Sequence, residues 1–278
     1  FAGVRKTVDA TESEFARLRE GIIQMAREIP VAREEIARVM EVAGQLGIAT
    51  DYLLEFTRVA INMGVATTMS SDDAAMAMAR LANIMQMPQS QFERLGSTIV
   101  HLGNNLAATE GEIANMALRI AGAGHTIGLT EAQVLGLAAG LSAVGIRAEM
   151  GGSAISRTMI EIANAVETGT EELALFAQVA GMTVEDFSRL FREDAAEAVI
   201  AFIEGLGTVR AEGENLFLLL EELGLNEIRV RDLLLRAAGA GDLLRQSVQL
   251  GNQAWAENIA LTQEAERRYE TVESRLQM

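Results

Sequence analysis

Two histidines, His101 and His125, are the side chains in this sequence best suited to metal binding or proton transfer. They lie far apart along the chain, and the sequence contains no cysteine that could complete a metal site with them. A structural zinc site uses four clustered ligands, usually Cys or His. We therefore predict that both histidines lie at turns or helix ends, and that the chain binds no metal and no cofactor.

A second place to look for chemistry is the stretch MGGSAISR, residues 150–157, which follows Glu149. A nucleophilic serine elbow needs the pattern GxSxG after a strand, and neither is present. We interpret the stretch as a tight turn in which Gly151 and Gly152 bend the chain and Ser153 caps a helix. Glu149 is the best single candidate for a glycosidase acid, but that reaction needs two placed carboxyl groups. We expect no catalytic residue.

Methionines and the single tryptophan are candidates for binding rather than catalysis. A methionine-lined surface can form an adaptable groove, although methionine also fills irregular gaps in a core, and we favour core packing. Trp255 could anchor the last helix on the core or contact a partner. The methionines in question are Met63, Met69, Met76, Met78, Met85 and Met87.

The stretch GLTEAQVLGLAAGLSAVGI, residues 128–146, could be a membrane span, a glycine-rich ligand loop or closely packed helices. Its uncharged part, residues 132–146, is shorter than the roughly 20 residues that a spanning helix needs. The preceding GAGHTIG lacks the strand that a dinucleotide-binding loop requires. We favour closely packed helices, in which Ala138, Ala139 and Gly140 allow backbones to approach.

Helix starts and stops recur along the chain in one order. Gly128 ends an element, Leu129 is apolar, and Thr130 with Gln133 forms a capping box that begins the next helix. The same signals recur at Gly47, at Ser90 with Glu93, at Thr109 with Glu112, at Gly181 with Thr183 and Asp186, and at Gly224 with Asn226. The pattern predicts many short helices joined by short turns.

No segment alternates with the two-residue period of a strand, so the predicted fold class is all-α, a compact multi-helix domain. The expected helices cover residues 12–28, 31–46, 51–63, 72–86, 90–102, 110–122, 131–144, 153–167, 171–180, 184–191, 194–205, 213–223, 227–238 and 241–276.

We divide the chain into a lead-in helix at 1–28, a compact core domain at 29–250 and an exit helix at 251–278. From Gln253 onward the sequence has neither Gly nor Pro. Thr262, Tyr269 and Leu276 recur every seven residues, as do Ala265 and Val272. This predicts a longer amphipathic helix that leaves the domain toward a coiled-coil rod. Because the sequence does not begin with Met, we expect it to be a piece of a longer protein.

The composition restricts the partners. The formal net charge is −16, and Lys6 is the only lysine. This acidity argues against duplex nucleic acid and anionic membrane surfaces, because both attract basic proteins. Aromatic residues make up only 4% of the chain and hydrophobic residues 49%. The core must therefore be aliphatic, as suits close packing of helices.

Four stretches together resemble a known family. They are AGQLGIATDYLLEFTRVAINMGVATTMSSDDAAMAMARLANI (residues 43–84), FERLGSTIVHLGNNLAATEGEIANMALRIAGAG (92–124), GLTEAQVLGLAAGLSAVGIRAEMGGSAISR (128–157) and WAENIALTQEAERRYET (255–271). In this order they resemble the core region of the tail tape measure proteins of long-tailed bacteriophages, or of a prophage copy. The resemblance covers the chain from about Val4 to its end.

The resemblance implies a structural, non-enzymatic virion protein of the tail tube. Such proteins set tail length during assembly in the bacterial cytoplasm and are released when DNA is ejected. The implied partners are tail tube proteins, tail initiator or baseplate proteins, a tail assembly chaperone and further copies of the chain. No sequence-specific nucleic acid is expected, and membrane contact only on ejection. The alternatives are a membrane-active, pore-forming helical domain used in ejection and an all-α peptidoglycan hydrolase.

Overall fold

The structure is a computed structural model that describes residues 1–211 and 215–271. Every regular element in these residues is helical, which confirms the predicted all-α class: there are sixteen α-helices and one 3-10 turn. Contacts divide the chain into two compact units. Unit 1 consists of residues 1–104 and 253–278, and unit 2 of residues 105–252. Unit 2 is thus an insertion in the sequence of unit 1.

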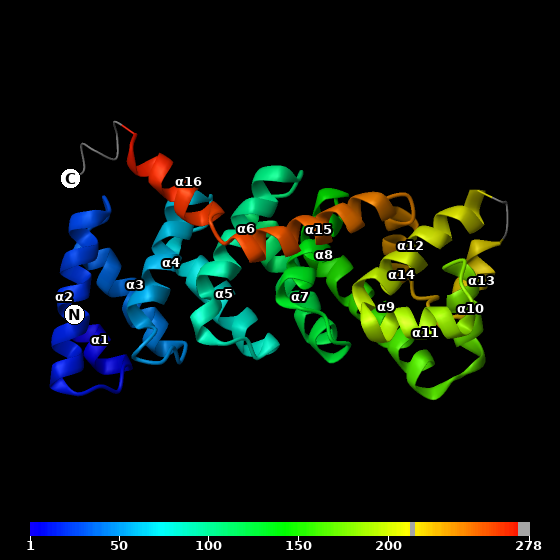
Figure 1. The fold of residues 1–278 in the computed structure, drawn as a ribbon, viewed down its shortest axis with the longest axis horizontal. Coiled ribbons are helices and arrows are strands. Elements are labelled where there is room, and N and C mark those ends of the chain that lie inside the picture. The colour runs from blue at the N-terminus through cyan, green and yellow to red at the C-terminus, as the bar shows by residue number, and fades with distance from the viewer. Residues whose placement is uncertain (212–214, 272–278) are drawn as a thin grey trace. The chain divides into compact units, whose positions relative to one another are not determined.

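Unit 1 is built from the first six α-helices and the last one. Helix α4 packs against α3, α5 and α16, and α3 also packs against α1 and α2 (Figure 1). The rings of Phe56 and Phe92 meet edge to face in its core, 4.6 Å between centroids. The elements are α1 (Ala2–Thr7), α2 (Glu12–Glu28), α3 (Arg33–Gln45), α4 (Leu53–Ala66), α5 (Ser71–Met85), η1 (Gln89–Gln91), α6 (Phe92–Asn105) and α16 (Ala260–Tyr269).

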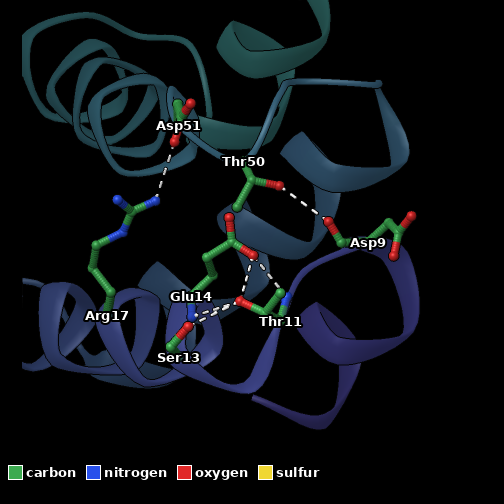
Figure 2. A network of polar contacts seen from close by, with 7 residues as sticks. All are labelled: Asp9, Thr11, Ser13, Glu14, Arg17, Thr50 and Asp51. Atoms are coloured by element: carbon green, nitrogen blue, oxygen red, sulfur yellow. Dashed lines mark hydrogen bonds and ion pairs between the residues drawn. The ribbon is translucent and has the colours of Figure 1, made fainter.

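The start of α2 shows how these short helices are fixed (Figure 2). Thr11 accepts a hydrogen bond from the Glu14 backbone, and the Glu14 carboxylate accepts one from the Thr11 backbone, 2.7 Å from nitrogen to oxygen. This capping box satisfies amides that a helix start leaves unpaired. Across the same region Arg17 pairs with Asp51 at 3.3 Å, and Thr50 donates to the Asp9 carbonyl.

Unit 2 contains the almost uncharged helix α8, which packs against α7. Helix α7 packs on both α8 and α9, and α12 contacts α10, α11 and α14. The elements are α7 (Glu110–Thr126), α8 (Glu131–Ala143), α9 (Ala148–Thr168), α10 (Glu171–Val179), α11 (Val184–Glu193), α12 (Ala195–Ala211), α13 (Leu216–Glu222), α14 (Ile228–Ala237) and α15 (Gly241–Glu257), whose last turn lies in unit 1.

The uncharged stretch proves to be a central helix with a locally encoded start. Gly128 has a φ of +87°, Leu129 is buried, and Thr130 with Gln133 forms the expected capping box. Nine of the thirteen residues of α8 are buried, which explains why the helix carries no charge after Glu131. A Cβ on Gly136 would lie 2.6 Å from the Val248 Cα, so this glycine lets α15 pack directly on α8.

Other predicted helix starts agree in part. Thr109 with Glu112 forms a capping box, and Thr183 accepts from the Asp186 backbone. Ser90 does not begin a helix: Pro88 precedes a 3-10 turn that contains Ser90 and leads into α6. Asn226 is not a cap either, because α14 begins one residue later, after Glu227. The sequence of the short helix α1 contains none of these helix-start signals, and α1 was not predicted.

The interpretation of MGGSAISR as a turn is wrong. Gly151 and Gly152 lie inside α9 and are buried, and Ser153 is in the helix body rather than at its cap. A Cβ on Gly152 would lie 2.3 Å from the Arg119 Cβ of α7. These glycines therefore serve close helix packing, and the bend falls earlier, at Gly145, whose φ is +78°.

The expected single helix over 241–276 is also wrong. It breaks between α15 and α16 at Asn258, whose φ is +52°. Helix α16 does not leave the domain but packs back on α4 (Figure 1). Val272 and Leu276 of the heptad pattern lie outside the described residues.

The two terminal segments that were set apart from the core, 1–28 and 251–278, belong almost entirely to unit 1. The expected core, 29–250, is shared between the two units. The contacts thus group the chain differently from the expected three-part division. Contacts do not tell which parts of the chain fold independently, so the three-part division into residues 1–28, 29–250 and 251–278 stays a prediction in that respect.

Candidate functional site

The residues singled out for chemistry are not brought together. His101 lies on α6 in unit 1 and His125 in the last turn of α7 in unit 2. His125 is exposed and His101 is partly buried. Within the described ranges, no group of three or more His, Asp or Glu side chains is arranged to hold a metal ion.

Glu149 lies in a pocket of about 390 Å³ in unit 2, together with Glu112, Arg147 and Ser142. A glycosidase would need one carboxyl group there with a raised pKa. The Glu112 carboxylate instead accepts hydrogen bonds from the Thr109 backbone and hydroxyl, which hold its pKa below the usual value. The Glu112 carboxylate is therefore engaged in helix capping.

Methionine serves mainly as core. Met63, Met78, Met85 and Met87 are buried, whereas Met69 and Met76 are partly exposed. The residues form no continuous methionine surface, in agreement with core packing. Among the helices that the structure describes, none is long and apolar enough to cross a membrane.

Helix α16 contacts helices α4 and α6 of unit 1 through both apolar and polar side chains, and we call this contact the seam. Leu261 and Ala265 are each 1% exposed in this seam. Thr262 donates to Glu93 of α6 at 3.3 Å, and the Tyr269 hydroxyl donates to Asn62 of α4 at 2.6 Å. Helix α16 is thus fixed by a short apolar stripe with a polar bond at each end.

Helix α6 also holds the break that precedes α16. The Arg94 guanidinium donates to the Trp255 carbonyl at 2.5 Å, near the end of α15. Three residues further along α6, the buried Ser97 hydroxyl accepts from the Leu261 backbone at 3.3 Å, in the first turn of α16. One face of α6 therefore supplies partners to the end of one helix and the start of the next.

A pocket of about 430 Å³ opens beside the seam, lined by Glu28, Glu55, Arg58, Glu93 and Tyr269 among others. Burial, and then repulsion from Glu93, raises the pKa of Glu55. Burial raises the pKa of Tyr269 to about 12. Hydrogen bonds from Gln24 and then Arg58 hold the pKa of Glu28 below its usual value. Of these groups, Tyr269 is the one that lies in the seam itself and has a shifted pKa.

A larger pocket, about 890 Å³, lies in unit 2 between α10, α12 and α13. Its cation, Arg245, pairs with Glu197 at 2.9 Å and with Glu204 at 2.8 Å. These bonds raise the pKa of Arg245 above its ordinary value. Because this guanidinium already has carboxylate partners, the pocket presents no unpaired cation for an anionic ligand.

Sequence reasoning missed the α16 seam. The signal was present in part: Leu261, Ala265 and Tyr269 are spaced by four residues, which places them on one helix face. The pattern was assigned to a coiled coil, because nothing in the local sequence says that α4 and α6 would receive it. Trp255 was expected either to anchor the last helix or to contact a partner; the structure shows a hydrogen bond to its backbone carbonyl, and a role of its side chain stays a prediction.

A model of the phage-related minor tail protein family matches residues 19–217, more than half of the chain. The chain belongs to this family. As a phage minor tail protein, it is similar to the probable tape measure protein of Halomonas phage phiHAP-1, 28% identical over 132 residues. That alignment covers 43% of this chain and 15% of the relative, so the chain matches only a small part of the relative's length. No solved structure matches.

The expected resemblance to phage tail proteins is confirmed at the level of the family, which makes this minor tail protein a structural component of the phage tail. The finer assignment to the core region of a tape measure protein stays a prediction.

Proposed function

We propose that this minor tail protein is a segment of a tape measure protein, the component that sets tail length during assembly and is released when DNA is ejected. The similarity to the probable tape measure protein of phage phiHAP-1 supports this proposal. We further propose that the segment is structural and not catalytic, in keeping with the capping role of Glu112 beside Glu149.

Within such a protein, we propose that the present segment is a folded body and that the ruler lies elsewhere. The observation that carries this is the length of the helices: the longest described one, α9, has 21 residues. Turns with left-handed glycines separate these helices, and the chain folds back into compact units. A ruler needs a chain that advances steadily, at about 1.5 Å per residue in a helix.

The proposed partners are tail tube proteins, tail initiator or baseplate proteins, a tail assembly chaperone and further copies of the chain. The proposed locations are the tail of the virion and, before assembly, the host cytoplasm. The formal net charge of −16 supports protein partners over nucleic acid, because an acidic surface repels phosphates.

The test is a change in the encoding phage. Unit 2, residues 105–252, is replaced by a short Gly-Ser linker or is duplicated in tandem, and tail lengths are measured in electron micrographs. If every residue measured length, excision would shorten the tail by about 220 Å and duplication would lengthen it by about as much. We expect changes far below this for both variants.

The control is a deletion of equal length in a part of the parent protein without Gly or Pro stops. There we expect shortening by the full amount. Tails that change in full proportion when unit 2 is excised or duplicated would show that the segment is unrolled in the tube, and the folded-body proposal would be wrong.

A further inference from the structure

The break between α15 and α16 is not encoded by a helix-breaking residue. From Asn252 to the end, the sequence contains neither Gly nor Pro. Asn258 takes a left-handed φ of +52°, a conformation that asparagine adopts more readily than other residues with a side chain but less readily than glycine. Its side-chain oxygen is buried without a hydrogen-bond partner, and Ile259 caps α16 with no side-chain bond. The hinge therefore carries several local costs.

What maintains the break is the docking on α6. Arg94 and Ser97 satisfy the Trp255 carbonyl and the Leu261 amide, the groups that an uninterrupted helix would pair within itself. Gly96 lies between them, and a Cβ there would come within 2.9 Å of the Leu261 side chain. Once α16 is off α4 and α6, intrahelical bonds replace both contacts. Helices α15 and α16 can then join into one helix of roughly 40 Å, from Gly241 to Tyr269.

Joining the helices uncovers apolar surface on both sides of the seam. Leu261 and Ala265 lose their cover, and so do Val59 and Met63, which lie beside Gly96 in the groove. The arrangement that relieves the hinge and still buries both sides places the α16 of one copy in the α4–α6 groove of another. A short, strained hinge next to a docked terminal helix is the setting in which such exchange costs least.

We propose that α16 exchanges between copies of this chain, so that the α4–α6 groove of one copy binds the α16 of a second copy. The exchanged contact repeats the intramolecular seam residue for residue, and the two-residue hinge becomes helical. Because each copy carries a formal net charge of −16, added salt should favour the exchange. The inference rests on the seam in unit 1 and on the continuity of α15 with α16, and it stands apart from the tail function.

The direct test uses crosslinking, because the chain has no native cysteine. Chains carrying Glu93→Cys are mixed with chains carrying Thr262→Cys and are treated with a short bismaleimide. Within one copy these two side chains are 3.3 Å apart. In the mixture, however, each chain has a single thiol, so only exchange brings the two thiols together. We expect a crosslinked dimer that contains one chain of each kind.

The matched control is a mixture of Arg17→Cys and Asp51→Cys chains. These side chains are also 3.3 Å apart, but they lie on α2 and in the turn before α4, away from the α15–α16 hinge. Mixed dimer at the Glu93/Thr262 pair should exceed this control at least tenfold and should rise with salt. Equal yields from the two mixtures would overturn the proposal.

A second test compares Asn258→Ala with Asn258→Gly. Both variants lose the buried side-chain oxygen, so they differ only in the Cβ. Alanine resists the left-handed hinge and favours the joined helix, whereas glycine does the reverse. We expect the dimerisation constant, measured by sedimentation, to be at least tenfold higher for Ala than for Gly.

Gln86, at the end of α5, is the control, because it has a similar φ of +54° but Pro88 follows it and prevents a joined helix. Gln86→Ala and Gln86→Gly should differ in stability and not in dimerisation. Equal dimerisation constants for the two Asn258 variants, with normal helical circular dichroism in both, would contradict the exchange.

Discussion

Helices α8 and α16 bury apolar side chains in opposite ways. Helix α8 packs against α7 and α15, is almost uncharged and begins with its own capping box. Helix α16 buries Leu261 and Ala265 on one face, exposes charged residues on the others and is capped by a serine from α6. Within α16, Glu264 pairs with Arg268 at 3.1 Å, in the orientation that supports a helix on its own.

The difference predicts which contacts open first. Removing α8 would leave apolar surfaces of α7 and α15 open to water, whereas α16 can leave its groove as an intact helix. Local opening needs far less free energy than global unfolding where few apolar contacts are lost. We therefore expect α8 to report on global unfolding of unit 2, and α16 on its own undocking.

The largest expected effect is that of Gly136→Ala in α8. The new Cβ would meet the backbone of α15, at 2.6 Å from the Val248 Cα and 2.7 Å from the Ser247 carbonyl oxygen. Because backbone cannot rotate away, we expect a loss of about 3 kcal/mol, at the upper end of overpacking costs. Urea unfolding measures it. Wild-type stability would show that α8 and α15 are not in direct contact.

The next effect is undocking of α16 by alkali. Burial raises the pKa of Tyr269 from 10.0 to about 12, so the docked state retains the phenol proton more tightly than the undocked state. The stabilisation is complete below pH 10 and is lost as the pH rises from about 10 to about 12. A separation of about two pKa units corresponds to roughly 2.7 kcal/mol.

Hydrogen exchange measures this undocking, because α16 should lose protection across that pH range before α8 does. Tyr269→Phe should remove the pH dependence of α16 protection. Simultaneous loss of protection in both helices would remove the distinction between them.

A smaller effect concerns the way in which helices begin. Gly128→Val and Gly181→Val place a β-branched residue at φ of +87° and +69°. We expect each to cost more than about 1 kcal/mol in urea unfolding, from the strain of left-handed geometry. Unchanged unfolding for both valine variants would mean that these turns relax without cost.

Ser97→Ala, by contrast, should speed hydrogen exchange in α16 and leave hydrogen exchange in α8 unchanged.

The smallest expected effect is an increase in the free energy of unfolding. Gly122 lies in α7 in open space, with no atom within 4 Å of an added Cβ. Gly122→Ala should stabilise unit 2 by about 0.5–1 kcal/mol through helix propensity. It is also the matched control for Gly136→Ala, since both are helical glycines that differ in what surrounds them. A loss at Gly122 would show that the space around α7 is occupied.

Local signals predicted much of this fold. The turn at Gly128, the buried Leu129 and the box at Thr130 were readable because their interactions fall within a few residues of sequence. Gly151 and Gly152 were misread, because a glycine that bends a chain and a glycine that admits a neighbouring helix look alike without knowledge of the neighbour.

The seam could not be predicted from the sequence either, because its packing partners are distant along the chain. The break at Asn258 depends on Arg94 and Ser97, more than 150 residues earlier in the sequence. A local pattern free of helix breakers therefore predicted one long helix. The resemblance to phage tail proteins rested on the order of four long stretches, because none of the candidate catalytic or ligand-binding residues pointed to a function.

The placement of unit 2 within the sequence of unit 1 has a mechanical consequence. When the two ends of this segment are pulled apart while α16 is docked, the tension passes from α16 into α4 and α6 and is borne by unit 1. Unit 2, residues 105–252, is inserted between the parts of unit 1 that bear the tension, so no force acts along its chain. The force reaches these residues only after α16 undocks from its groove. We therefore expect the seam to open under tension before unit 2 begins to unfold.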